Sequence, residues 1–342
     1  MARETGSLHR YLLTRLALAV PMVLILLTLV FTLMRVAPGD PITAALGGRL
    51  PAAELQRRRA AAGFDRPVIV QYGEYLWSVA HLDFGTTLID NRPVLSVIAQ
   101  NGSATLELTA WAMLVAVGVG VPLGLLAGRF RDTGTDLGFR LFGIVIYAAP
   151  VFFLGFLAQL VFGKYLNWLP TSGRASPLIG YELQTHTQLF VIDAIIDRNW
   201  SALTDVLRHL VLPAMTLGLV IGGVFIRMVR VNVMQTLKGD YVEAARARGV
   251  KERWVLFRHA FKNALVPVIT VMGLQFALLL SGAVLTEETF NWPGLGFQLV
   301  RYLNNRDYIA VQGIITFAGL VVVLVSLAID VLTAWVDPRV RY

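Results

Sequence analysis

Few residues in this chain have the types and spacing that chemistry at an active site requires. No H-E-x-x-H zinc motif and no G-x-S-x-G string is present. The segment FGKYL comes nearest to a phosphate-binding loop, but it lacks the earlier glycine and the hydroxyl residue after the lysine. The histidines stand apart from one another, at His9, His81, His186, His209 and His259. The sequence therefore predicts no catalytic centre, metal site or cofactor in this chain.

The segment DYVEAARARGV, residues 240–250, is charged, although long apolar runs surround it, and its spacing predicts a short capped helix over 241–248. Asp240 and Glu243 fit a capping box, in which each side chain accepts a hydrogen bond from a backbone N–H of the first turn. Gly249 marks the end, because glycine adopts the left-handed conformation without steric cost. So short a helix is unstable alone, so we expect it to need a partner surface.

Ala244 and Ala245 give this helix a thin face on which another backbone could approach closely. The residues alone leave two interpretations open. The helix either lies on anionic lipid with its arginines toward the headgroups, or it docks onto a cytosolic protein.

The elements that carry this segment are apolar and long. Of the 342 residues, 56% are hydrophobic and none is cysteine, which excludes disulfides and cysteine-ligated metals. Six runs are long enough to cross about 30 Å of hydrocarbon as helices. They lie near 13–34, 105–128, 139–163, 210–229, 264–285 and 311–335. The sequence predicts an all-α integral membrane protein with a single transmembrane domain, residues 1–342.

Basic residues predict the orientation of these spans. Lys and Arg gather in the N-terminus, between the second and third spans, in the loop 227–263 and in the C-terminal tail. These segments share one side if the chain crosses six times, so the positive-inside rule places both termini and this loop in the cytoplasm. The net charge of +8 then reflects membrane topology, and we do not expect nucleic acid as a partner.

The first external loop covers residues 35–104. We expect it to be folded, because it contains sequences that are typical of turns. Arg57, Arg58 and Arg59 lie in it. Long loops are largely exempt from the charge rule. These arginines favour contact with an acidic partner outside, whereas the alternative is that the loop caps the outer mouth of a pathway.

Three polar residues fall within or beside the predicted spans. Gln275, in the fifth span, either lines a pathway or hydrogen-bonds a neighbouring helix. Asp330, near the inner end of the sixth, is interpreted as the partner of a cytoplasmic arginine. Glu107, near the outer end of the second, is interpreted as a cap or an interfacial contact.

Segments along the whole chain resemble one family. EAARARG matches the E-A-A-x-x-x-G core of permease subunits of bacterial ABC importers, and the longer string from Asp240 to Thr270 resembles their dipeptide/oligopeptide branch. APGDP, FGTTL, NWLPTSG, LRHLVLPAMTLGL, LTEETFNWPGLG and DPRVRY match in the same order.

The resemblance implies a six-span permease fold of the type I ABC importers and no enzymatic activity in this chain. It implies that Asp240, Tyr241, Glu243, Ala244, Ala245 and Gly249 couple the chain to a cytosolic ATPase. The implied partners are a homologous second permease, two ATPases that bind ATP and Mg, an extracytoplasmic substrate-binding protein and the bilayer of the cell (inner) membrane.

The implied function is ATP-driven import of di- or oligopeptides, with this chain forming half of the pathway. Relatives that move nickel chelates, glutathione or other small solutes are the near alternatives. An ion-gradient-driven carrier is the alternative from another class, but it would need ionisable groups deep in several spans.

Overall fold

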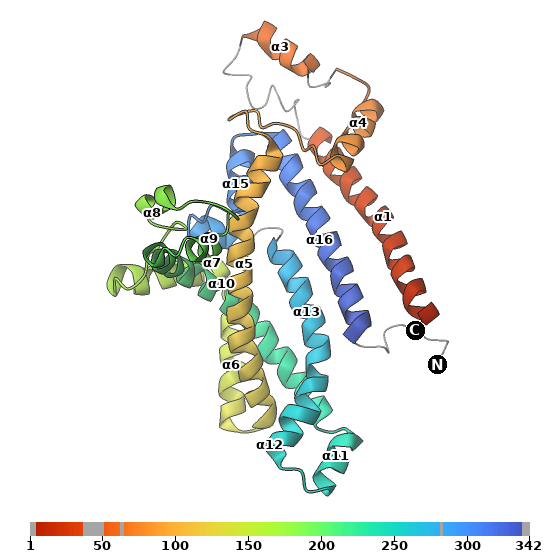
Figure 1. Ribbon diagram of the computed structural model, residues 1–342, viewed down its shortest axis with the longest axis vertical. Coiled ribbons are helices and arrows are strands. Elements are labelled where there is room, and N and C mark those ends of the chain that lie inside the picture. Colours follow the sequence, from red (N-terminus) through yellow and green to blue (C-terminus); the bar gives the residue numbers. More distant parts are fainter. Residues whose placement is uncertain (1–4, 37–50, 62–64, 281–282, 337–342) are drawn as a thin grey trace.

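The computed structural model describes residues 5–36, 51–61, 65–280 and 283–336. Within these ranges the chain is helical and forms no β-strand, apart from an isolated bridge between Thr86 and Pro93. The long helices run lengthwise through the molecule (Figure 1). They are α1 (Thr5–Val36), α5 (Val94–Arg129), α6 (Gly134–Ala148), α10 (Trp200–Thr236), α13 (Lys262–Leu280) and α16 (Tyr308–Val336).

Four of these helices, α1, α5, α10 and α16, are long and apolar enough to cross a membrane by themselves. A fifth candidate is α6 together with the helices α7 (Val151–Ala158) and η1 (Gln159–Tyr165, a π-helix). The apolar part of α13, Pro267–Leu280, is shorter than a full span. The described residues thus show an all-helical membrane protein with four or five candidate spans, and the count of six stays a prediction.

The third predicted span, 139–163, is not one straight helix. Its two halves meet at an angle of 100° between Ala148 and Val151. The cause is Pro150, which has no N–H to donate and which drives Ala149 into an extended conformation with ψ of 135°. Figure 1 shows α7 leaving the bundle sideways, with α8 (Pro177–Glu182) and α9 (Phe190–Ile196) beside it.

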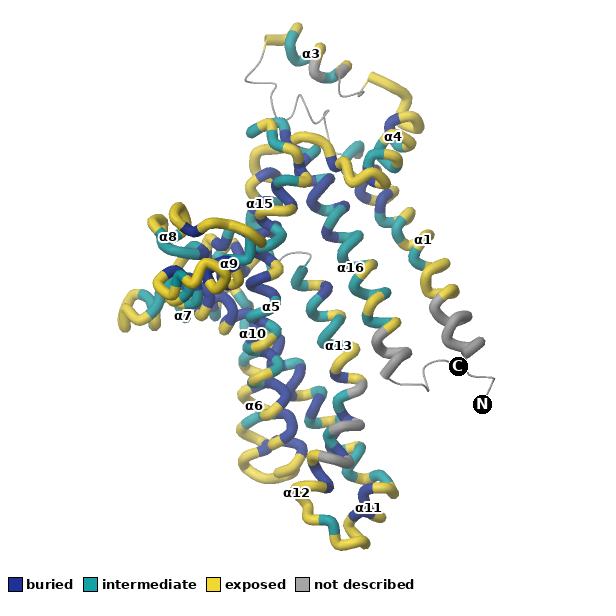
Figure 2. The backbone as a smooth tube through the Cα atoms, viewed as in Figure 1, coloured by how far each residue is buried: buried dark blue, intermediate teal, exposed yellow. Residues whose placement is uncertain are grey.

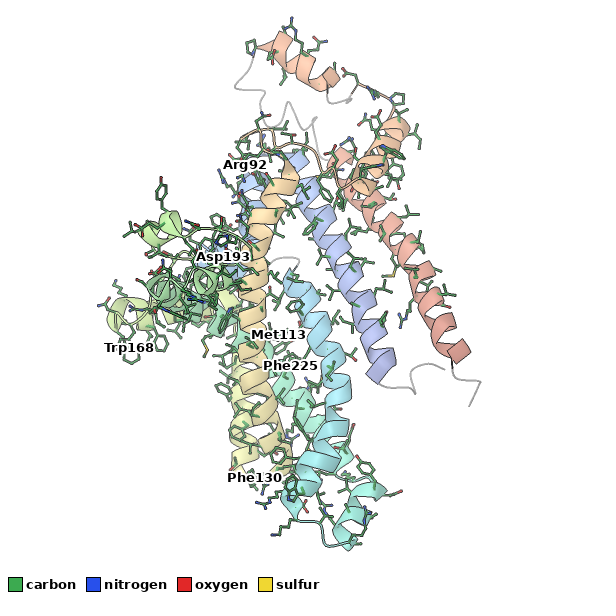
Figure 3. The ribbon with its side chains drawn as sticks, in the orientation of Figure 1. Arg92, Met113, Phe130, Trp168, Asp193 and Phe225 are labelled. Carbon is green, nitrogen blue, oxygen red and sulfur yellow. The ribbon has the colours of Figure 1, made fainter. Side chains whose placement is uncertain are left out.

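Helices α5 and α10 form the centre of the bundle. About 72% of the apolar window of α10 is buried, against 17% for α1 and 11% for α16. Small residues bring the two backbones together. A Cβ added at Gly120 would lie 2.7 Å from the carbonyl oxygen of Gly222, and one at Gly218 would lie 2.5 Å from that of Ala112. In Figure 2 the buried positions follow this pair, and Figure 3 shows Phe225 and Met113 where they pack between α5 and α10.

The helices α16 and α1 lie at the outside of the bundle, with α13 between α16 and the central pair. Their link is polar at one end, where Arg15 Nη1 lies 3.3 Å from Asp330 Oδ2. The interpretation of Asp330 as the partner of an arginine is confirmed, and the arginine comes from the N-terminal helix.

Short helices cover both ends of the bundle (Figure 1). At one end are α3 (Ala52–Ala61), α4 (Val68–Ala80) and α15 (Leu295–Asn304), while α14 (Val284–Thr289) packs against α15 and α7. At the other are α11 (Asp240–Ala247), α12 (Glu252–Trp254) and the π-helix η2 (Val255–Phe261). This second end also holds the turn between α5 and α6, where Figure 3 labels Phe130. We call the end with α3 and α4 the outer end and the end with α11 the inner end, after the orientation that the sequence predicts and that stays a prediction.

Candidate functional site

Helix α11 lies at the inner end between α10 and α13, within one residue of its predicted bounds. Its inward side is apolar. Val242, Ala245 and Val255 are fully buried in one small cluster, against which Leu237 and Val250 pack. Leu237 is the residue after α10 and Val255 begins η2, so this cluster fastens α11 to the helices on either side. The partner surface that so short a helix requires is partly supplied by the chain itself.

The C-terminus of α11 is closed as the sequence predicts. Gly249 has a φ of +76°, in the left-handed region. The N–H of Gly249 donates to the carbonyl of Arg246 at 2.8 Å, and the N–H of Val250 donates to that of Ala245 at 3.2 Å. These are the two hydrogen bonds of a Schellman motif, and the packing of Val250 against the Ala245 cluster completes it.

The predicted capping box at the N-terminus is wrong. The cap residue is Gly239, and no side chain caps the helix. Helix α11 begins one residue earlier than predicted, so Asp240 is its first helical residue and its carboxylate is not placed to accept the capping bond. Asp240 and Glu243 are both exposed in the first turn, where they still face the positive end of the helix dipole.

A charged clamp holds the turn that follows α11. Arg246 donates from Nε and Nη2 to the two carboxylate oxygens of Glu252, at 3.1 and 2.6 Å. The hydrogen bonds of this pair raise the pKa of Arg246 and lower the pKa of Glu252. Both side chains are about half exposed, so the clamp fixes geometry more than it adds stability.

The two alanines of α11 do not share a face. Ala245 is buried in the cluster, whereas Ala244 is exposed together with Tyr241 and Glu243. The surface that α11 offers to another molecule is therefore narrower than expected: an alanine flanked by a tyrosine, 42% exposed, and by acidic residues of the first turn. We call this exposed surface, formed by Tyr241, Glu243 and Ala244, the α11 ridge.

Gln275 is half-buried on α13 and makes no hydrogen bond to any residue within the described ranges. Within the described residues, Gln275 therefore does not hydrogen-bond a neighbouring helix of this chain. Its role in a pathway stays a prediction.

The arginine run of the external loop lies on α3, which stands above the outer end of the bundle in Figure 1. Arg57 is exposed and Arg59 lies 3.9 Å from Asp65. The side chain of Arg58, like residues 37–50 and 62–64 of the loop, lies outside what the structure describes. Contact with an acidic partner stays a prediction for these residues.

Sequence reasoning did not find a buried ion pair that anchors the segment after η1. Glu107 accepts from Arg174 Nε at 2.8 Å and from the N–H of Val191 at 2.8 Å, and both charged side chains are almost fully buried. Arg174 also stacks over the ring of Phe190, 3.8 Å from its centroid. Glu107 thus accepts a hydrogen bond from the first turn of α9, which agrees with its interpretation as a cap, and it also forms a buried ion pair that was not predicted. Its partner lies 67 residues away in sequence, so no local signal points to the pair.

A second buried carboxylate anchors the segment after α13. Glu287, fully buried, accepts from the hydroxyl of Thr105 at 2.7 Å and from the N–H of Phe297 at 2.8 Å. Burial raises the pKa of Glu287. Gly294 and Gly296 leave the room that its carboxylate occupies. Trp292 donates from its indole N–H to the carbonyl of Ala104 at 2.9 Å. The segment after η1 and the segment after α13, which we call the two outer segments, are therefore both held by the same turns of α5.

These features define a class. The chain is a multi-pass helical membrane protein, with a small helix held rigidly at one end of its spans and anchored segments at the other.

The family follows from comparison with known proteins. Residues 120–342 match the family of binding-protein-dependent transport system inner membrane components, and residues 8–109 match the N-terminal part of such components. The chain belongs to this family. It is a membrane component of a transport system, and the family is not one of enzymes.

Curated relatives match along nearly their whole length. The dipeptide transport system permease protein of Escherichia coli is 36% identical over 338 residues, covering 97% of this chain and 99% of the relative. The di/tripeptide transport system permease protein of Pseudomonas aeruginosa is 35% identical over 333 residues (97% and 98%). The glutathione transport system permease protein of Salmonella choleraesuis is 35% identical over 332 residues (97% and 99%).

Proposed function

We propose that this chain is the permease subunit of an ATP-driven importer of di- or oligopeptides in the cell membrane. It forms half of the translocation pathway, crosses the membrane six times and leaves both termini in the cytoplasm. A homologous second permease forms the other half. ATP and Mg bind to two cytosolic ATPases, and a substrate-binding protein delivers the peptide outside.

The observation that carries this proposal is the construction of α11. A helix of eight residues transmits force only if its two ends are fixed. Here the Schellman turn, the Arg246–Glu252 clamp and the buried Val242 cluster fix it to α10 and η2. An exposed ridge on a fixed base suits docking into a groove of another protein. A helix lying flat on lipid would instead expose a broad apolar face, and the apolar face of α11 is turned inward.

The peptide substrate is supported by the names of the relatives. Two of the three relatives described above are permeases for dipeptides or di- and tripeptides, and the third is a permease for glutathione, itself a peptide. The near alternatives remain glutathione, nickel chelates or another small solute. For nickel, the described residues offer no group of three metal-ligating side chains.

The test is uptake by a strain that lacks this chain and has no active paralogue. We expect such a strain to lose uptake of a labelled di- or tripeptide, to regain it with the wild-type chain, and to take up nickel normally throughout. Normal peptide uptake with loss of nickel uptake would reverse the assignment. Peptide uptake that follows an imposed ion gradient and persists without ATP would favour the carrier instead.

A further inference from the structure

A cavity of about 550 Å³ lies between α6 and α10. The two helices are antiparallel here, since Asp136 pairs with Arg230 and Gly143 approaches Gly223. This register orders the wall of the cavity. Toward the inner end it is lined by Arg140, Arg227, Arg230 and Val231, and away from that end by apolar and small residues: Gly143, Ile144, Tyr147, Ala148, Gly223 and Val224.

The arginines of this cavity are not equivalent. Arg230 donates from Nε and Nη2 to the two carboxylate oxygens of Asp136, at 2.6 and 2.7 Å, and Asp136 is buried. Arg140 and Arg227 are exposed, and neither has a hydrogen-bond or ion-pair partner within the described ranges. With Arg230 neutralised by Asp136, the cavity keeps two uncompensated positive charges at its inner end. These two charges favour a ligand with an anionic group at this end of the cavity.

The rest of the cavity is apolar and favours a hydrocarbon part of the ligand. Its apolar wall continues onto the outward side of α6, where Ile144 and Tyr147 are 57% and 61% exposed and the neighbouring Val145 is 65% exposed. A ligand that satisfies both parts has an anionic head at the arginines and an apolar tail along α6.

We propose that this cavity binds the headgroup phosphate of an anionic phospholipid between Arg140 and Arg227, with an acyl chain lying along α6. Basic pockets between membrane helices on the cytoplasmic side suit such headgroups, because anionic lipids and positive side chains meet there. The choice of leaflet rests on the proposed orientation of the chain. The site itself rests only on the cavity and its charges.

Two other occupants fit less well. A peptide substrate is a zwitterion, and no carboxylate lines the cavity to receive its ammonium group, since Asp136 is already held by Arg230. A surface of the second permease would have to bring an acidic residue to each of Arg140 and Arg227 in order to avoid burying them unpaired. A lipid phosphodiester, by contrast, offers acceptor oxygens to both guanidinium groups and places its one negative charge between them.

The experiment titrates the assembled transporter with phosphatidylglycerol or phosphatidylcholine of matched chains and counts bound lipids by native mass spectrometry. We expect tighter retention of phosphatidylglycerol by the wild type. Arg140→Gln/Arg227→Gln should weaken that retention by roughly 30-fold, from about fivefold for each basic residue near an anionic headgroup. The matched control is Arg129→Gln/Arg131→Gln, which removes two positive charges at the same end outside the cavity and should leave retention unchanged.

Four outcomes would overturn the proposal. Equal retention by the wild type and the Arg140/Arg227 variant would show that the cavity holds no headgroup. Glycerophosphoglycerol binding as tightly as the whole lipid would make it a site for a free anion. Displacement of the lipid by a dipeptide would assign the cavity to the substrate. A cross-link from a cysteine at position 227 to the second permease, formed in high yield, would make it a subunit interface.

Discussion

Replacing Gly249 by valine tests whether the closed turn after α11 is needed to couple this chain to its ATPase. Gly249 has a φ of +76°, and a Cβ there meets nothing within 4 Å, so the Cβ itself creates no clash and we expect the effect to lie in the backbone. A left-handed conformation costs an ordinary residue roughly 1–2 kcal/mol, and a β-branched residue falls at the upper end of this range. About 2 kcal/mol shifts the balance between closed and open turn by a factor of about 30.

The assay is peptide-stimulated ATPase activity and peptide uptake by the assembled complex in proteoliposomes. We expect coupling to fall in the order glycine, asparagine, alanine, valine at position 249, because asparagine tolerates the left-handed region better than alanine. Gly134→Ala is the matched control, since a Cβ there also meets nothing and its φ is not left-handed. Full coupling in an assembled Gly249→Val complex would refute the reasoning, as would an equal loss in the Gly134 control.

Three further predictions concern other parts of the chain. A cysteine at Ala247 should react with an impermeant reagent only after the cells are opened, whereas one at Tyr181, 91% exposed on α8, should react in intact cells; the reverse pattern would invert the orientation. Replacing the arginines at 57–59 by alanine should weaken association with the binding protein and flatten its salt dependence, measured by titration at low and high ionic strength, and unchanged affinity at both would leave the loop as a cap. Arg174→Met should lower the free energy of unfolding by about 3–5 kcal/mol, because it leaves Glu107 buried and unpaired; the loss should be far smaller when Glu107→Leu is added, and equal melting curves for single and double variants would contradict this.

The features that sequence reasoning located correctly depend on neighbours a few residues apart. The left-handed turn at Gly249, two residues after the last residue of α11, follows from the conformational freedom of glycine. Both bounds of the helix were misplaced by one residue, because the cap position is taken by Gly239 and not by Asp240. The separation of Ala244 from Ala245 had a signal that was missed: Val242 and Ala245 are three residues apart and therefore share the buried side of the helix.

Other features depend on contacts that no local pattern encodes. The bend within the third predicted span had a visible cause in Pro150, but a proline alone does not separate a mild kink from a turn of 100°. The Glu107–Arg174 and Glu287–Thr105 contacts join residues 67 and 182 positions apart. The sequence showed only that these residues are polar and lie near apolar runs. It could not show which residues pair, because pairing over such separations is decided by the packing of the whole bundle.

The glycine-lined contact between α5 and α10 has a mechanical consequence. Where the backbones touch, at Gly120 against Gly222 and at Gly218 against Ala112, no side chain lies between them, so we expect α5 and α10 to resist sliding there and to move as one unit. Helix α10 has 37 residues, a length of about 55 Å, and the α11 ridge is fastened to its inner end. The outer part of α5 carries Glu107 and Thr105, to which both outer segments are tied. If α11 docks onto an ATPase as proposed, we expect a force on its exposed side to tilt those segments as well, because one pair of closely packed helices connects the two ends of the bundle.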